Sequence, residues 1–172
     1  MKKYTDIILD ALKGRRFETI LEMGCGAGHN LKVIKEKYPK TKLWGYDIDE
    51  TRVEEAKKIP DTIVEIGDFT EKETPFKDKK FDIVLMMATL IYISPEKMIQ
   101  TMENIKKSAK KEVILIEIHS LDRIIYKIYF LRDYERLLKE NGFKNIKLKK
   151  IPRWLWPGLN YKDDGYIISA EI

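Results

Sequence analysis

The chain has 172 residues, a formal net charge of +5, and a composition that is 44% hydrophobic and 35% charged. This balance is typical of one globular domain and excludes an intrinsically disordered chain, and no apolar run approaches the roughly 20 residues that a membrane span needs. A single cysteine, Cys25, excludes an internal disulfide framework.

The first residues predict a helix over residues 4–13 that packs over the core. Asp6 and Asp10 interrupt the apolar run that a signal peptide would require. Together with the single cysteine, this favours a cytoplasmic protein. We expect a monomer or a homodimer.

Strand and helix patterns alternate along the rest of the chain. The predicted strands are residues 17–23, 42–49, 62–68, 81–90, 112–118, 143–151 and 166–172. The predicted helices are residues 29–38, residues 50–58, a helix that begins at Pro95, and residues 131–141 before Gly142. This order predicts a single α/β domain, residues 1–172, with a Rossmann-like, doubly wound seven-stranded sheet. We expect the sheet to be mostly parallel, with an antiparallel C-terminal strand.

One long irregular segment, residues 152–165, stands before the last predicted strand. Loops of this length in compact domains are often functional, so the segment is a possible substrate lid. Trp154 and Trp156 could stack on a sugar or a planar ring there, or pack a lid against the sheet.

Three glycines, Gly24, Gly26 and Gly28, follow the first predicted strand. Glycine lets the backbone approach a ligand closely and adopt positive φ. The spacing differs from the G-x-G-x-x-G of dinucleotide sites, and the carboxylate of Glu22 would repel a pyrophosphate. The pattern therefore disfavours a nucleotide-dependent oxidoreductase and suits a ligand with a cationic amino-acid end.

Two acids follow at later strand ends. Asp47 ends the second predicted strand and Asp68 ends the third. Each could be a strand-end, cap or turn residue. Their order on successive strand ends, after the glycines, favours a binding site at that edge of the sheet.

The run L-E-M-G-C-G-A-G resembles motif I of the class I S-adenosylmethionine-dependent methyltransferases, and residues 17–120 follow the family's pattern. The resemblance implies S-adenosylmethionine as cofactor and S-adenosylhomocysteine as product. It implies that Asp47 binds the ribose hydroxyls, that Asp68 accepts from the adenine amino group, and that Phe69 packs on the ring. The cofactor-binding residues so predicted are Glu22, Gly24, Cys25, Gly26, Gly28, Asn30, Asp47, Ile48, Asp68, Phe69 and Met87.

A second resemblance, to small methylases of carbohydrate (pseudaminic-acid type) biosynthesis clusters, runs through the C-terminal half. It depends on G-H-N-L at residues 28–31 and R-D-Y at residues 132–134. The chain departs from that family at Tyr92, where a histidine is usual, and at Ile118-His119, where an aromatic pair is usual. The implied acceptor is a small molecule, a sugar or amino sugar among the candidates. The alternatives are a nucleic-acid methyltransferase and a non-catalytic module that binds S-adenosylmethionine.

Few catalytic residues are needed, because positioning alone supplies much of the rate in such a transfer. His119 is the candidate general base, or a strand-end histidine bonded to the backbone. Tyr92 could orient an acceptor oxygen, or pack. Arg132 could bind a charged acceptor group, or form an internal ion pair.

The sequence has no Cys/His/Asp/Glu cluster with metal-ligand spacing, so we expect no metal. Lysine and glutamate alternate along most predicted helices, as they do on solvated, thermophile-like surfaces. We therefore expect a small-molecule partner, and neither a nucleic-acid nor a membrane partner.

Overall fold

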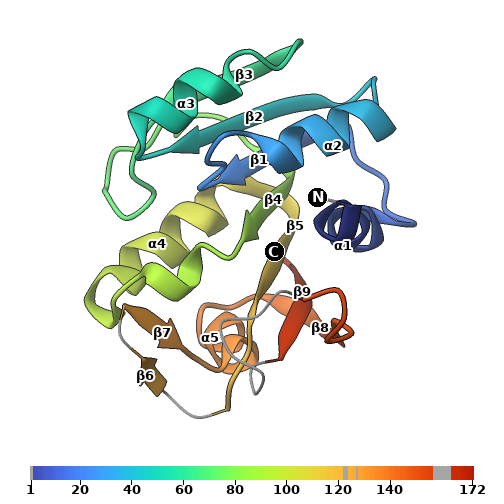
Figure 1. Cartoon of the computed structure of the whole chain (residues 1–172). Helices are drawn as coiled ribbons and strands as arrows, with labels where there is room; N and C mark the ends of the chain where they lie inside the picture. The colour runs from blue at the N-terminus through green and yellow to red at the C-terminus, as the bar shows by residue number, and fades with distance from the viewer. Residues whose placement is uncertain (1, 122–123, 127, 157–163) are drawn as a thin grey trace.

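The computed structural model describes residues 2–121, 124–126, 128–156 and 164–172. Its main sheet has seven strands in the order β3-β2-β1-β4-β5-β9-β8 (Figure 1). The strands of this sheet are β1 (Thr19–Met23), β2 (Lys42–Asp47), β3 (Thr62–Ile66), β4 (Phe81–Met87), β5 (Ala109–Ile118), β8 (Lys144–Lys150) and β9 (Gly165–Glu171). β1 to β5 pair in parallel, and β9 runs antiparallel to both β5 and β8. The predicted fold class is confirmed.

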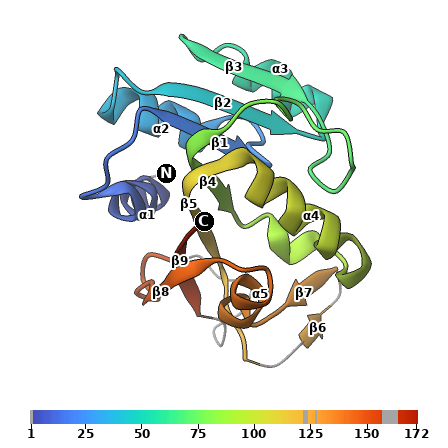
Figure 2. The ribbon, with the colours of Figure 1, turned by 180° about the vertical axis from the view of Figure 1, so that it is seen from behind.

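Helices cover both faces of this sheet (Figures 1 and 2). They are α1 (Lys2–Leu12), α2 (His29–Lys37), α3 (Glu50–Ala56), α4 (Pro95–Ser108) and α5 (Tyr134–Glu140), with a 3₁₀ turn η1 (Leu90–Tyr92) before α4. α1, α2 and α3 share one apolar cluster with the sheet, and α4 and α5 share the other. Since residues 81–86 are buried between the two clusters, β4 is the continuous apolar run expected of a central parallel strand.

The N-terminal helix contributes directly to the core. Ile7, Ile8, Ala11 and Leu12 of α1 are buried, in the same cluster as Ile20 of β1 and residues of α2. Leucine and isoleucine recur on one face of α1, which is the face that packs.

Two features between β5 and α5 differ from the sequence prediction. Residues 124–126 and 129–131 form a two-stranded hairpin, β6 (Ile124–Tyr126) and β7 (Tyr129–Leu131), which the sequence did not predict. The last helix begins at Tyr134 rather than at residue 131, because Leu131 pairs with β6 and Asp133 caps the helix by accepting from the N–H of Arg136 at 3.0 Å.

The sheet order reverses between β1 and β4, so the carboxyl ends of these two strands open a crevice where ligands of such sheets bind. The segments that follow β1, β2, β3 and β4 meet at this edge. Within the described residues, no helix is long and apolar enough to cross a membrane.

Candidate functional site

The glycine turn after β1 is held closely by neighbouring segments. Gly24 and Gly28 both have a φ of +75°, which L residues rarely adopt. A Cβ atom added at Gly24 would lie 2.4 Å from Cγ2 of Thr89, and one added at Gly28 would lie 2.5 Å from Cδ1 of Ile59. Backbone conformation and crowding therefore both require glycine at these two positions.

Asp47, at the end of β2, holds the middle of the same turn. Its Oδ2 accepts from the N–H of Gly26 at 2.7 Å, and its Oδ1 accepts from the N–H of Asp49 at 3.0 Å. Because each carboxylate oxygen can accept more than one hydrogen bond, both oxygens keep capacity for a ligand. Around Gly26 the nearest side-chain atoms to an added Cβ belong to Arg52, at 3.9 Å.

Glu22, at the end of β1, is a buried carboxylate with one oxygen in use. Its Oε1 accepts from Nδ2 of Asn30 at 2.6 Å, whereas Oε2 has no hydrogen-bond partner among the described residues. Burial and, to a smaller extent, the charge of Asp47 raise the pKa of the Glu22 carboxyl to about 8, against the lowering effect of the Asn30 hydrogen bond. A buried oxygen without a partner is costly unless a donor or a cation reaches it.

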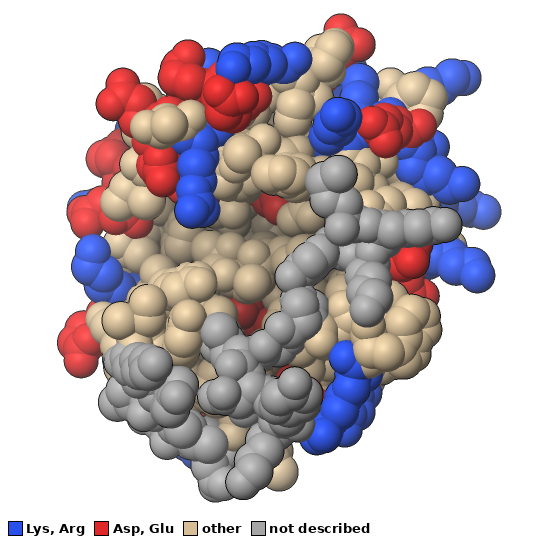
Figure 3. Space-filling model, in the orientation of Figure 1, with Lys and Arg blue, Asp and Glu red and all other residues tan. Residues whose placement is uncertain are grey.

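These groups surround one cavity of about 840 Å³, a volume within the usual range of small-molecule sites. Figure 3 shows that this side of the molecule is hollowed near its middle, with acidic atoms visible inside the hollow. The predicted cofactor residues that line the cavity are Glu22, Gly24, Cys25, Gly26, Asn30, Asp47, Ile48, Phe69 and Met87. Of the remaining two, Gly28 packs against α3, and Asp68 stands next to the lining residue Phe69.

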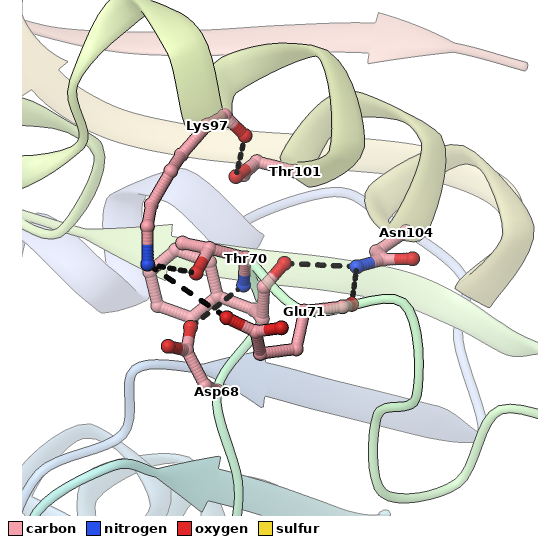
Figure 4. A network of polar contacts seen from close by, with 7 residues as sticks. Asp68, Thr70, Glu71, Lys97, Thr101 and Asn104 are labelled. Carbon is pink, nitrogen blue, oxygen red and sulfur yellow. Dashed lines mark hydrogen bonds and ion pairs between the residues drawn. The ribbon is translucent and has the colours of Figure 1, made fainter.

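The loop after β3 carries Asp68 and Phe69. Oδ1 of Asp68 accepts from the N–H of Thr70 at 2.8 Å, as Figure 4 shows. Phe69 is buried in the cluster under α4 and also lines the cavity. The loop thus presents a carboxylate and an aromatic ring side by side at the edge of the site.

The end of β4 has an uncommon backbone. Ala88 has a φ of +50°, which costs a non-glycine residue about 1–2 kcal/mol. The next two N–H groups, of Thr89 and Leu90, both donate to Oε1 of Glu117 at 2.8 Å. Glu117 therefore fixes the loop that packs against Gly24, and strain at such a loop is typical of functional sites.

Glu117 was not singled out in the sequence, although a carboxylate inside the apolar run V-I-L-I-E-I was a signal for it. It is fully buried in β5, and burial raises its pKa to about 7. Hydrogen bonds from Thr89 and Leu90 and the charge of Arg132 act in the opposite direction.

The two predicted catalytic residues lie in different surroundings. Tyr92 is half exposed and lines the cavity, and its ring centroid is 5.4 Å from that of Tyr129. His119 does not line the cavity, and its Nδ1 accepts from the backbone N–H of Tyr134 at 3.2 Å. The lone pair of Nδ1, which a general base would need, is thus engaged by the backbone. This geometry counts against His119 as a general base.

The predicted substrate residues are not brought to the cavity. Arg132 is buried, donates through Nη2 to the carbonyl of Ile93 at 2.5 Å, and lines a second cavity of about 420 Å³ between α4 and α5. Trp154 is 68% exposed, and Trp156 packs against the apolar clusters and Gly165. Residues 157–163 of the predicted lid lie outside the described residues.

Comparison with known proteins gives a family match. A family model described as a methyltransferase domain matches residues 20–112, more than half of the chain. A malonyl-[acyl-carrier protein] O-methyltransferase from Anoxybacillus flavithermus is 28% identical over 115 residues, which are 65% of this chain and 42% of that protein. The chain spans less than half the length of the curated relatives it matches.

Solved structures share the fold. Human N-acetylserotonin methyltransferase, crystallised with S-adenosylmethionine, has a TM-score of 0.71 at 21% identity over 97% of this chain and 51% of its own. The O-methyltransferase of a polyketide synthase from Brevibacillus brevis, crystallised with S-adenosylhomocysteine, has a TM-score of 0.77 at 14% identity over 98% and 71%.

Proposed function

The chain belongs to the methyltransferase domain family, and on that premise we propose that it transfers a methyl group from S-adenosylmethionine to a small-molecule acceptor and releases S-adenosylhomocysteine. The observation that carries this proposal is the cavity at the carboxyl ends of β1, β2 and β4. It combines a tight glycine turn with the buried, half-partnered carboxylate of Glu22 and the carboxylate of Asp47.

The chemistry of these groups fits the cofactor from end to end. Glu22 and Asn30 would meet the charged amino-acid end, where an ammonium group supplies the donor that Oε2 of Glu22 lacks. Asp47 would accept from the ribose hydroxyls. Asp68 and Phe69 would hold the adenine, and Met87 would lie beside the methionine portion.

When bound, the cofactor supplies a methyl group on a positively charged sulfur, which is already activated for transfer. The residues of the chain then need only to bind, orient and exclude water. The closely packed glycine turn and the loop that Glu117 anchors are suited to that task.

Tyr92 is the lining residue best placed to act on the acceptor. Burial raises the pKa of its hydroxyl, and the neighbouring Tyr129 raises it further. The hydroxyl therefore stays protonated near neutral pH. Tyr92 would donate a hydrogen bond to an acceptor oxygen rather than remove its proton.

A small acceptor is favoured over RNA by the mixed charge of the surface. Among the described residues around the hollow in Figure 3, basic and acidic side chains stand next to each other. The related proteins named above include methyltransferases of an acyl-carrier-bound malonyl group and of N-acetylserotonin, so small acceptors occur among them. A sugar or amino sugar remains the narrower proposal.

Incubation with S-adenosylmethionine carrying a trideuterated methyl group tests this function. The protein would be offered sugars, amino sugars, carboxylic acids, phenols and total RNA, and mass spectrometry would detect S-adenosylhomocysteine and the labelled product. We expect label in a small molecule, and less of it with Asp47→Ala when S-adenosylmethionine is limiting. Label in RNA alone would support the nucleic-acid alternative. Cofactor binding without label in any acceptor would support the non-catalytic alternative.

A further inference from the structure

A buried asparagine on α4 holds the loop that carries Asp68 and Phe69. Asn104 is 3% exposed, and its Nδ2 donates to the carbonyl of Phe69 at 2.9 Å and to the carbonyl of Glu71 at 2.7 Å (Figure 4). Its Oδ1 accepts from Nε2 of Gln100 at 3.1 Å. Both N–H groups of the amide are thus used on one loop that lies more than thirty residues away in the chain.

A second side chain of α4 reaches the same loop from a more exposed position. Nζ of Lys97 donates to Oγ1 of Thr70 at 3.2 Å and lies 3.8 Å from Oε1 of Glu71. Thr70 in turn donates its N–H to Asp68. Figure 4 shows the loop gathered under α4 by these contacts.

The loop needs this support because β3 is the edge strand of the sheet and only Val64 of that strand is buried. On the other side of the loop, the N–H of Gly67 donates to the carbonyl of Asp47 at 3.0 Å. α4 therefore supplies the polar contacts that decide where the ring of Phe69 and the carboxylate of Asp68 stand.

We propose that Asn104 is a positioning residue: by holding the carbonyls of Phe69 and Glu71, it places Asp68 and Phe69 to bind the adenine ring, so that affinity for the adenosine half of the cofactor depends on α4. This role rests on the proposed function. Asn104 itself touches neither the cavity nor the reacting atoms.

The test is a comparison of two buried positions on one helix. Asn104→Leu keeps the branching at Cγ and the number of side-chain heavy atoms, and removes both donors. Thr101→Ala is the matched control, because Thr101 is fully buried on α4 but donates to Lys97 of its own helix at 2.9 Å. Thermal melts and calorimetric titration with S-adenosylhomocysteine and with adenosine would be measured for both.

Both variants should lose thermal stability, but only Asn104→Leu should bind S-adenosylhomocysteine and adenosine about tenfold more weakly. In a Phe69→Ala background, the same change at Asn104 should cost less than threefold, because the part of its effect that passes through the Phe69 ring is already lost. If Asn104→Leu fails to fold, Lys97→Met tests the same loop from an exposed position, and we expect about threefold weaker binding.

The role of Asn104 is refuted if Asn104→Leu binds both ligands as tightly as Thr101→Ala does, or if its effect is undiminished in the Phe69→Ala background. If Asn104→Leu does not fold and only Lys97→Met can be measured, unchanged affinity for both ligands refutes the proposal that binding depends on the contacts of α4 with this loop. A parent protein that binds neither ligand refutes the proposed function itself, and the role of Asn104 with it.

Discussion

The two halves of the site are built differently. On the cofactor side, local sequence motifs at the ends of β1, β2 and β3 bring carboxylates and glycines into one cavity. Beyond β5, two residues that the sequence predicted to act on the acceptor are bonded to the protein itself: His119 to the N–H of Tyr134, and Arg132 to the carbonyl of Ile93. These side chains have the chemistry that catalysis needs, but the structure uses them in hydrogen bonds within the protein.

The difference follows from how each half is encoded. A glycine turn and a strand-end acid act within a few residues of one another, and parallel strands place such groups at a common edge. The region beyond β5 depends on the hairpin of β6 and β7, on α5 and on Trp156, whose contacts with the rest of the chain join residues far apart in the sequence.

The largest effect on cofactor affinity should come from a side chain added at Gly24, where the turn packs against Thr89. Gly24→Val adds a Cβ that would lie 2.4 Å from the Thr89 side chain and forces a left-handed backbone on a β-branched residue. We expect S-adenosylhomocysteine affinity to fall by at least about a hundredfold in calorimetric titration.

Gly14→Val is the matched control for that change. Gly14 has a φ of +77° and nothing within 4 Å of an added Cβ. It should cost about 1–2 kcal/mol of stability and leave affinity unchanged. Equal losses of affinity in both variants would mean that general strain, rather than the turn, controls binding.

Asp47→Ala should have the next largest effect. It removes the charged acceptor of the Gly26 N–H and the proposed ribose contacts, so we expect affinity for S-adenosylhomocysteine to fall about 10- to 100-fold. Asp133→Ala is the counterpart in the other half of the molecule, because Asp133 also accepts from a backbone N–H, as the cap of α5. It should lose about 1 kcal/mol of stability and no affinity.

Unchanged affinity in Asp47→Ala would show that Asp47 does not bind the ribose.

Glu22 should make the free protein less stable as the pH rises. Its folded pKa of about 8 lies above that of an unfolded glutamate, so between the two values the folded state holds the extra proton, and the free energy of unfolding falls with rising pH. The slope is at most about 1.4 kcal/mol per pH unit. Glu117, whose pKa is also raised, to about 7, acts in the same direction, so the loss of slope in Glu22→Gln, rather than the pH range alone, assigns the effect to Glu22.

Denaturant unfolding should be measured across this pH range. The free energy of unfolding should fall with pH in the parent protein and in Glu54→Gln, which changes an exposed carboxylate on α3. In Glu22→Gln the contribution of Glu22 to that fall should be lost. Binding of the cationic cofactor end should also release a proton from Glu22 near neutral pH, which titration in buffers of different ionisation enthalpy detects. An unchanged slope in Glu22→Gln would contradict the assignment.

The smallest effect is expected at His119. His119→Ala removes one hydrogen bond to the N–H of Tyr134, so stability should fall by about 1 kcal/mol with no change in cofactor affinity. Once an acceptor is known, Tyr92→Phe should lower turnover more than His119→Ala does. If His119→Ala loses turnover and Tyr92→Phe does not, His119 would again be the candidate general base.

The sequence predicted the sheet, its helices and most of the residues that meet in the cavity because their signals are local. Apolar runs, Pro95, Gly142 and the spacing from Glu22 to Gly28 can each be read within a few residues. Glu117 and Asn104 act on loops more than twenty-five residues away, so even the signal of a carboxylate in the apolar run around Glu117 does not reveal its partner.

The hairpin of β6 and β7 was missed for a related reason. Each strand is only three residues long, too short for a period to show. The start of α5 was misjudged because Leu131 continues its helical pattern, although it belongs to β7.

The central claim is that the cavity between β1 and β4 holds S-adenosylmethionine, and calorimetric titration of the parent protein with S-adenosylmethionine and S-adenosylhomocysteine tests it most directly. The account predicts one site per chain and micromolar dissociation constants for both ligands. Absence of binding by either ligand at millimolar concentration, from a protein shown to be folded, would contradict it.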